Sequence, residues 1–286
     1  MPRTNSRTAT LTIASVNVNG LRAACTNGMA GWAAQRDCDI VTMQEVRAPD
    51  DMVTGLVQQA LGDGWHVAHA ECSAKGRAGV AVASRLPIID SRFGLGGSVD
   101  GRGSGGFDCS GRWLEADIDL PTGTAGLTVI SCYVHTGDAE DTDRMAEKLA
   151  FLDAATDRLQ ELRASGRHVL LTGDLNVGHR ELDIKNWKGN VGKAGFHPDE
   201  RARFDRWFHE LGWVDIGRSL TGEVPGPYSW WSWRGKAFDV DSGWRIDYQI
   251  ASPELAALAQ SHEVDRAPTY AERWSDHAPV VVRYRL

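Results

Sequence analysis

Residues 127–175 contain the succession that decides the fold class: LTVISCYVH at Leu127–His135, a charged stretch at Glu140–Arg163, and HVLLTGDL at His168–Leu175. Both flanking runs are rich in β-branched and apolar residues, which is typical of strands. In the charged stretch, apolar side chains recur near helical spacing at Met145, Leu149, Leu152, Leu159 and Leu162. The segment therefore predicts a strand, a helix and a second strand.

The same kinds of element extend outward in both directions from this segment. Further strands are predicted at Leu11–Val18, Asp39–Glu45, Trp65–Glu71, Gly79–Ser84, Arg112–Leu120, Tyr228–Trp233, Trp244–Ala251, His262–Arg266 and Pro279–Arg285. Further helices are predicted at Gly20–Arg36, Asp51–Leu61 and Pro198–Glu210. Because helices separate some strands and tight turns separate others, we expect an α/β sandwich of two packed mixed β-sheets flanked by helices. No linker-like stretch divides residues 11–286, so they are predicted to form one domain after a short flexible leader, 1–10.

The composition of the chain excludes several classes of protein. Charged residues make up 24% and hydrophobic residues 42% of the 286 residues, as in an ordinary globular domain. No apolar run approaches the roughly 18–20 residues that a membrane span needs, and we expect neither a signal peptide nor a membrane partner. The five cysteines are scattered and form no CxxC pair, which predicts reduced thiols in a cytoplasm. A net charge of −7 argues against coating nucleic acid by bulk charge.

Polar residues stand at or just past the ends of five predicted strands. They lie in the segments Ser15–Arg22, Met43–Glu45, Gly173–Val177, Gly243–Tyr248 and Ser275–Pro279. These segments supply Asn17, Asn19, Glu45, Asp174, Asn176, Asp247, Asp276 and His277. One such residue is most simply a strand cap, but five strand ends of this kind suggest that the side chains converge. Converging carboxylates repel one another, so a cation is the natural compensation, and oxygen ligands favour Mg²⁺ or Mn²⁺ over Zn²⁺.

These segments resemble the exonuclease III class of apurinic/apyrimidinic (AP) endonucleases, within the endonuclease/exonuclease/phosphatase superfamily. The most specific match is HRELDIKNWKGN at His179–Asn190, continuing through AGF at 194–196 and Glu200-Arg201. The resemblance runs from about Leu11 to the C-terminus and implies a four-layered α/β sandwich. It also implies a Mg²⁺-dependent DNA-repair phosphodiesterase, with Mn²⁺ as a substitute. Such an enzyme cuts duplex DNA 5′ to abasic sites and removes nucleotides or blocking groups from 3′ ends.

The resemblance implies a metal centre with a water-activating carboxylate beside it. Glu45, in the Gln-Glu motif, resembles the principal Mg²⁺ ligand, and Asn17 and Asp276 match positions near the metal. Asp174 matches the residue that orients or deprotonates the attacking water. The position of Asn19 is Asp in some members and Asn in others, so Asn19 is expected to support the site from behind the ligands.

The resemblance also implies the groups that contact the phosphate and the DNA. Asn176 matches a donor to the scissile phosphate. Asp247 and His277 match a hydrogen-bonded pair whose imidazole contacts that phosphate, and Tyr133 matches a tyrosine near the phosphate or leaving group. Residues that match the sugar pocket or the DNA contacts are Trp230, Trp244, Arg22, Arg47 and Arg77. Lys185 is open to two interpretations, a phosphate contact or a solvated loop charge.

The chain departs from the family after Tyr133, where His135-Thr136 and an acidic run replace the usual Pro-Asn or Pro-Gln. This departure leaves the ratio of endonuclease to exonuclease activity open. Two alternative functions also remain at this point. One is the same fold acting on RNA, a phospholipid or an inositol phosphate, and the other is a catalytically silent DNA-binding homologue. We expect a monomer that acts on double-stranded DNA in the cytoplasm, with nucleoid-associated activity in a bacterium.

Overall fold

The computed structural model describes residues 10–95, 109–120 and 126–286. The predicted leader lies outside these residues except for Thr10, which begins strand β1 and pairs with Arg285. Six strands form the first sheet in the order β11–β12–β1–β2–β4–β3. Their bounds are β1 Thr10–Asn17, β2 Ile40–Gln44, β3 His66–Ala70, β4 Val80–Ser84, β11 Ala259–Val264 and β12 Val280–Arg285. In this sheet β1 and β2 run parallel and the other pairs antiparallel.

The second sheet also has six strands, in the order β5–β6–β7–β8–β10–β9. Their bounds are β5 Ile88–Phe93, β6 Trp113–Ile118, β7 Leu127–Tyr133, β8 His168–Asp174, β9 Val214–Asp215 and β10 Asp247–Ala251. Strands β7 and β8 are parallel because helix α4 (Thr142–Ala164) carries the chain back between them. Asp141 caps this helix by accepting hydrogen bonds from the backbone N–H groups of Asp143 and Arg144.

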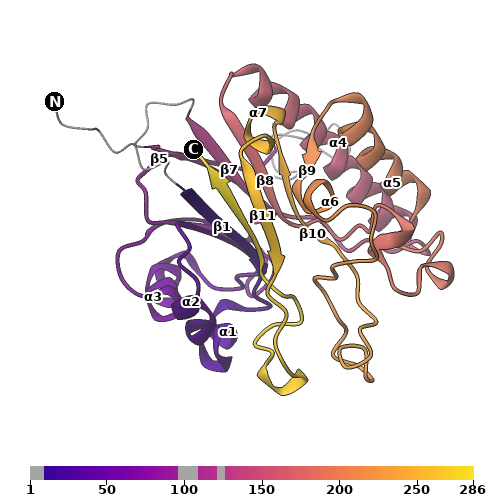
Figure 1. The fold of residues 1–286 in the computed structure, drawn as a ribbon, viewed down its shortest axis with the longest axis horizontal. Coiled ribbons are helices and arrows are strands. Elements are labelled where there is room, and N and C mark those ends of the chain that lie inside the picture. Colours follow the sequence, from indigo (N-terminus) through magenta and orange to yellow (C-terminus); the bar gives the residue numbers. More distant parts are fainter. Residues whose placement is uncertain (1–9, 96–108, 121–125) are drawn as a thin grey trace.

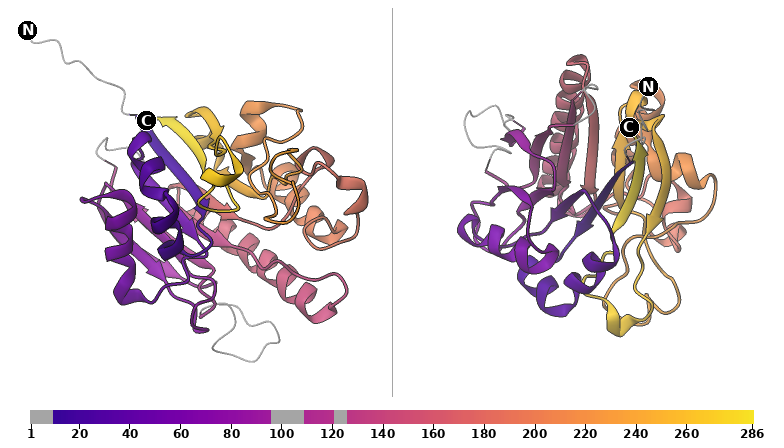
Figure 2. Two further views of the ribbon diagram at one scale, coloured as in Figure 1. Left: turned by 90° about the horizontal axis from the view of Figure 1, so that it is seen from below. Right: turned by 60° about the vertical axis from the view of Figure 1, so that its left-hand side comes forward.

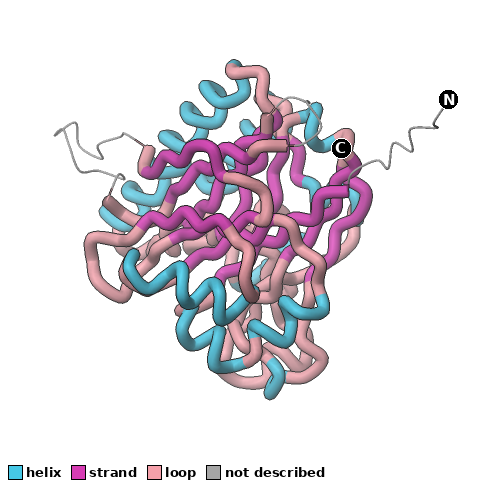
Figure 3. Tube along the Cα trace, turned by 90° about the vertical axis from the view of Figure 1, so that its left-hand side faces the viewer, coloured by secondary structure: helices cyan, strands magenta, loops and turns pink. Residues whose placement is uncertain are grey.

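Helices cover the outer faces of both sheets, as Figures 1 and 2 show. The helices other than α4 are α1 Leu21–Asn27, α2 Met29–Gln35, α3 Asp50–Leu61, α5 Pro198–Asp205, α6 Ile216–Thr221 and α7 Pro253–Ala256. Helices α1–α3 pack on the first sheet, and α4 and α5 pack on the second. Figure 3 shows helices on both sides of the strands, so the predicted four-layered α/β sandwich of two mixed sheets is confirmed. Among the described residues, no helix has the length and apolar character needed to cross a membrane.

Successive side chains of each strand point to opposite faces of its sheet, one toward the core between the two sheets and the other toward the helices outside. In β1, Ile13 packs between the two sheets, whereas Ala14 and Val16 pack against the helices α1–α3. In β8, Leu170 faces the other sheet and Leu171 faces α4. Because each of these strands is covered on both faces, the sequence contains the near-continuous apolar runs that predicted them.

A few polar contacts fix how the two sheets lie on each other. The hydroxyls of Thr42 and Thr172 are 2.7 Å apart, and the side-chain amide of Gln44 donates to the Ser131 hydroxyl over 3.0 Å. These residues belong to β2 in the first sheet and to β8 and β7 in the second. The contacts are buried, so a shift of one sheet would leave polar atoms unsatisfied. They therefore set the relative position of the strand ends.

Several predicted elements differ in extent. The prediction of a strand at Tyr228–Trp233 was wrong. Trp230 forms only isolated β-bridges, one to Trp244 and one to His277, so the segment does not pair continuously with any strand. The predicted helix at Gly20–Arg36 is two helices, since Gly28 adopts a left-handed φ of 119° that ends α1. Beyond Asp205, the predicted helix at Pro198–Glu210 continues as a π-helical segment. The elements that were not predicted are β5, β9, α6 and α7.

We expect Gly173→Ala to destabilise the fold by about 2–4 kcal/mol. Gly173 has a φ of 136°, and a Cβ there would lie 1.9 Å from the carbonyl oxygen of Cys132 in the neighbouring strand β7. The free energy of unfolding from urea titrations measures the effect. Gly55→Ala in α3 is the control, because a Cβ at that position would meet nothing within 4 Å. It should leave stability unchanged or raise it by up to about 1 kcal/mol, and equal effects at the two positions would contradict the steric argument.

Candidate active site

Strand register brings the predicted catalytic side chains to one edge of the sandwich. In the second sheet Asp174 pairs with Tyr133 on one side and with Asp247 on the other. In the first sheet Asn17 ends β1, paired with Gln44, which immediately precedes Glu45. The carboxyl-terminal ends of β1, β2, β7 and β8 therefore meet here, together with the first residue of β10.

The side-chain amide of Asn17 connects the two sheets. Its Nδ2 donates to Glu45 Oε1 over 2.8 Å and to Asp174 Oδ2 over 2.9 Å. Its Oδ1 accepts a hydrogen bond from the backbone N–H of Asn19 over 3.0 Å. Asn17 is fully buried, so its orientation is set by these three bonds. One amide thus holds two carboxylates of different sheets at a fixed separation.

Left-handed backbone conformations occur at the turns that follow the strand ends. Asn19, Glu45, Arg47 and Asn176 have φ values of 49°, 52°, 51° and 50°. Such values are uncommon for residues other than glycine, and they are concentrated at functional sites. At Asn176 the turn is stabilised by the backbone N–H, which donates to Asp174 Oδ1 over 3.0 Å, and by the side-chain amide, which donates to the Val134 carbonyl.

His277 lies between two buried aspartates. Its Nδ1 is 2.8 Å from Asp247 Oδ2, and its Nε2 is 3.7 Å from Asp174 Oδ2. Asp247 also accepts a hydrogen bond from the Ser229 hydroxyl over 2.6 Å. The contact with Asp247 orients the ring so that Nε2 faces Asp174 and the pocket.

The buried charges shift one another's protonation. Burial raises the pKa of Asp174 to about 7, and Asp247 and Glu45 add to the rise, while His277 and the hydrogen bond from Asn17 oppose it. Burial alone would lower the pKa of His277, but Asp247 and Asp174 outweigh it and raise that pKa to about 10. The pKa of Tyr133 is raised, mainly by burial and then by Glu45 and Asp174. At neutral pH the site holds an imidazolium beside a carboxyl group close to its own pKa.

A cavity of about 260 Å³ opens above these groups. Trp230 and Trp244 form aromatic walls, with ring centroids 6.3 Å apart and planes at 87°. Asp276 lies at the rim, where Oδ1 accepts from the Asn19 side chain over 2.8 Å and Oδ2 accepts from Trp230 Nε1 over 3.1 Å. The structure therefore brings together most of the predicted residues. Those that line the cavity are Glu45, Tyr133, Asp174, Asn176, Trp230, Trp244, Asp276 and His277.

The predicted DNA contacts lie outside this cavity. Arg22, Arg77 and Lys185 are exposed, and the Arg22 guanidinium lies 3.0 Å from the sulfur of Met52. Arg47 is also exposed, and its guanidinium forms an ion pair with Glu45. The structure thus places Arg47 beside the predicted metal ligand and leaves the other three on the surface.

A buried ion pair beneath the cavity was not predicted from the sequence. Lys148 of α4 and Glu200 of α5 are both fully buried, and their charged atoms lie 2.5 Å apart. Lys148 Nζ also donates to the carbonyls of Asn176 and Thr136, over 2.8 and 3.0 Å. Glu200 accepts from the backbone N–H of Gly195, which, like Asn176 and Thr136, lines the cavity. The only sequence signal was a lysine at a helix position that faces the sheet.

The donor set fits a hard divalent cation. The carboxylates of Glu45, Asp174 and Asp276 line one cavity, and the Asn17 side-chain amide holds the first two in place through its NH2 group. Oxygen ligands of this kind suit Mg²⁺, which takes one or two carboxylates and completes its shell with water and phosphate oxygens. Burial first, and then the neighbouring carboxylates of Asp247 and Glu45, raise the pKa of Asp174, so a cation held beside it would favour the ionised form.

We expect Asp174→Asn to stabilise the metal-free protein at pH 8. The carboxyl ionises near pH 7 when folded but has an ordinary value of 3.8, so folding is disfavoured progressively as pH rises between these values. Asparagine does not titrate, so the variant should exceed the wild type by on the order of 1 kcal/mol or more at pH 8. Near pH 4 that advantage should disappear. Urea unfolding in EDTA across this range provides the measurement, and parallel pH profiles would contradict the shift.

We expect Lys148→Met to cost about 3–5 kcal/mol, because it leaves the Glu200 carboxylate buried without a partner. Adding Glu200→Gln should recover part of the loss, since the double variant buries no unpaired charge. The exposed pair Arg203–Asp153 joins the same two helices over 2.7 Å and is the control. Arg203→Ala should cost at most about 1 kcal/mol. Equal losses for the two pairs in urea unfolding would mean that burial has no bearing on their energetics.

Comparison with known proteins agrees with this geometry. Residues 14–277 match the Endonuclease/Exonuclease/phosphatase family. An exodeoxyribonuclease of Bacillus subtilis (strain 168) is 32% identical over 268 residues, which cover 93% of this chain and 96% of that protein. An AP endonuclease from Archaeoglobus fulgidus matches with a TM-score of 0.82 at 29% identity, covering 96% of this chain and 100% of the other.

A second solved structure shares the fold to a similar degree. It is the 3′ phosphatase NExo from Neisseria bound to a product DNA hairpin, with a TM-score of 0.83 and 27% identity. The match covers 96% of this chain and 100% of the NExo chain. The expected resemblance is confirmed: the chain belongs to the Endonuclease/Exonuclease/phosphatase family and, within that family of phosphodiester hydrolases, to the DNA-repair nucleases.

Proposed function

We propose that this chain is a Mg²⁺-dependent DNA-repair phosphodiesterase that cuts duplex DNA 5′ to abasic sites and removes nucleotides or blocking groups from 3′ ends. The observation that carries the proposal is the Asn17 amide, which holds Glu45 and Asp174 together beside the His277–Asp247 pair. The relatives named exodeoxyribonuclease, AP endonuclease and 3′ phosphatase support it. So does the aromatic cavity, whose size suits a base-free sugar.

In this proposal the reaction is an attack of water on the scissile phosphorus. The water oxygen forms a new P–O bond, the bond to the 3′ oxygen breaks, and the 3′ oxygen receives a proton. Asp174 orients the water and takes up its proton, which its raised pKa favours at neutral pH. The departing oxygen lies on the opposite side of the phosphorus from the attacking water. We assign its proton donor to Tyr133, which lines the cavity and whose hydroxyl is held protonated.

The phosphate itself is held by donors that face the cavity. We assign this role to the side-chain amide of Asn176 and the imidazolium of His277, both of which line it. Asp247 keeps the imidazole charged and oriented, so positive charge is already in place when the pentavalent phosphate develops negative charge. Lys148 supports Asn176 from below as a positioning residue.

We assign the Mg²⁺ ion to Glu45, with Asn17 and Asp276 beside it and Mn²⁺ as a substitute. When bound, the ion supplies charge neutralisation and Lewis-acid polarisation of phosphate oxygens. Asn19 supports the site through its hydrogen bonds to Asn17 and Asp276. Trp230 and Trp244 accept the base-free sugar, and the exposed cations Arg22, Arg47, Arg77 and Lys185 contact the DNA backbone.

Two alternatives make different predictions about substrate. One is cleavage of RNA, a phospholipid or an inositol phosphate, and the other is DNA binding without catalysis. We favour DNA repair because the segment His179–Asn190 matches that branch and because the complete set of candidate catalytic residues is present. We further propose that residues 11–286 work as one catalytic domain, as a monomer in the cytoplasm.

The decisive experiment offers the purified chain four substrates: a duplex with a stable abasic analogue, an intact duplex, an RNA duplex and an inositol phosphate. Each is tested with Mg²⁺ and with EDTA. We expect Mg²⁺-dependent incision 5′ to the abasic analogue and slower 3′ trimming of the intact duplex. We also expect Glu45→Ala to lower kcat by about 10²-fold or more while it retains the fold.

The outcomes separate the alternatives. Incision that persists in EDTA would contradict the metal mechanism. Turnover of RNA or inositol phosphate alone would show that the chain acts on one of those substrates and not on DNA. Binding of the abasic duplex without turnover under any divalent cation would select the second. Glu71→Ala is the matched control for Glu45→Ala, because Glu71 is an exposed glutamate in the same half of the chain that lies outside the cavity.

A further inference from the structure

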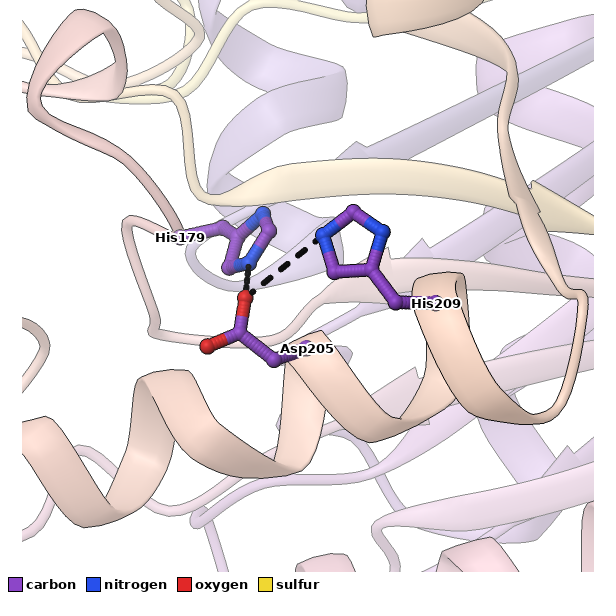
Figure 4. A group of neighbouring side chains, drawn as sticks. All are labelled: His179, Asp205 and His209. Carbon is purple, nitrogen blue, oxygen red and sulfur yellow. Dashed lines mark hydrogen bonds and ion pairs between the residues drawn. The ribbon is translucent and has the colours of Figure 1, made fainter.

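A second group of possible metal ligands lies outside the cavity, where the segment after β8 meets the end of α5. His179 comes from that segment, and Asp205 and His209 stand four residues apart at the junction of α5 with the π-helical segment Arg206–Glu210. One ligand atom from each of the three lies within 4.8 Å of the other two. Figure 4 shows both imidazole rings beside the Asp205 carboxylate.

The distances are close to those of a coordination sphere. His179 Nε2 lies 2.7 Å and His209 Nε2 lies 3.8 Å from Asp205 Oδ1. Ligand atoms about 2.0–2.1 Å from a tetrahedral Zn²⁺ are about 3.3 Å apart. To bind the ion, the distance from Asp205 to His179 must therefore lengthen, and the distance from Asp205 to His209 must shorten, by about half an ångström each. His209 is largely exposed and free to make this adjustment by a side-chain rotation.

The least mobile ligand is already oriented. His179 is buried, and its ring packs edge-on against Phe208 with centroids 5.2 Å apart and against Phe204 at 5.9 Å. Its backbone N–H donates to the Tyr248 hydroxyl over 3.3 Å. The π-helical segment sets where His209 emerges from the helix, and such segments occur frequently at functional sites.

The group also opens onto space for further ligands. His179, Asp205 and His209 line one cavity of about 620 Å³. Two imidazoles and one carboxylate, with room for water, suit Zn²⁺ and similar borderline cations, whereas the oxygen-rich catalytic cavity suits Mg²⁺. We propose that His179, Asp205 and His209 form a second metal site, selective for Zn²⁺-class divalent cations and separate from the catalytic centre.

A metal ion at this site would restrict the movement of the segment after β8, which carries Asn176. His179 lies three residues beyond Asn176, whereas Asp205 ends α5, the helix that carries Glu200, and His209 lies in the π-helical segment that continues it. An ion held by all three would cross-link this segment to α5 and stabilise the folded chain in proportion to its occupancy. The proposal stands on the contacts of these three residues and does not depend on the proposed reaction.

The test titrates the metal-free full chain with Zn²⁺ by calorimetry, in excess Mg²⁺ to occupy the oxygen-rich cavity, and repeats the titration with Co²⁺ by visible absorbance. We expect one Zn²⁺ equivalent and a rise in Tm. His209→Ala and Asp205→Asn should each weaken Zn²⁺ affinity by at least about tenfold. His209→Ala replaces an exposed side chain, so it should preserve the fold and Mg²⁺-dependent activity.

Two controls make the outcome decisive. His66→Ala removes an exposed histidine on β3 and should leave Zn²⁺ affinity and the Tm shift unchanged. Glu45→Ala should also retain Zn²⁺ binding, because Glu45 lies in the catalytic cavity. Equal Zn²⁺ affinity in the wild type, His209→Ala and Asp205→Asn overturns the proposal. Loss of Zn²⁺ binding in Glu45→Ala but not in His209→Ala also overturns it, by assigning the ion to the catalytic cavity.

Discussion

The two hydrogen bonds that the Asn17 NH2 group donates, one to Glu45 and one to Asp174, are the interaction on which the rest of the active-site geometry depends. Its two acceptors follow strands of different sheets, so the bonds form only when the sheets lie in one relative position. The buried contact between Thr42 and Thr172 fixes that position deeper between the sheets. The two packed sheets thus hold the two carboxylates at a fixed distance. Loops alone would position them less accurately.

Concentrating acids at this edge has an electrostatic cost that the protein offsets only in part. His277 gains a positive charge because Asp247 and Asp174 flank it, yet Asp174 is still hard to ionise because it is buried. Left-handed turns at Glu45 and Asn176 add backbone strain in the same place. Active sites commonly hold charges in the positions that catalysis needs even though this lowers the stability of the folded protein. A divalent cation bound at this edge would therefore offset electrostatic repulsion that the folded chain itself creates.

Sequence patterns predicted most of the sheets because both faces of β1, β2, β7 and β8 are buried, which gives long apolar runs. Edge strands lack that signal: four of the six residues of β5 are exposed and β9 has only two residues, so neither was predicted. The segment at Tyr228–Trp233 looked like a strand because it is rich in aromatic residues, but its two buried ones, Tyr228 and Trp231, pack with Phe238 and Ala278, which lie outside the strands. For the site, residue types at strand ends indicated that the acids, asparagines and His277 converge, whereas Tyr133, Trp230 and Trp244 were predicted only from the family resemblance. Lys148–Glu200 and His179–His209 depend on how helices dock, which local spacing does not encode.

The net charge of −7 bears on how such a chain approaches DNA. Residues 138–163 hold eight acids and four bases, and five of these acids are exposed, four of them on α4, an outer helix. Four further acids, Glu45, Asp174, Asp247 and Asp276, gather in or beside the catalytic cavity, where His277 contacts Asp247 and the proposed cation would add further positive charge. The remaining charge is close to balanced. We therefore expect bulk attraction to DNA to be weak. In the proposed function, binding would rest on a few exposed arginines, the bound cation and the aromatic walls, which would favour engagement at distorted or base-free sites over continuous coverage.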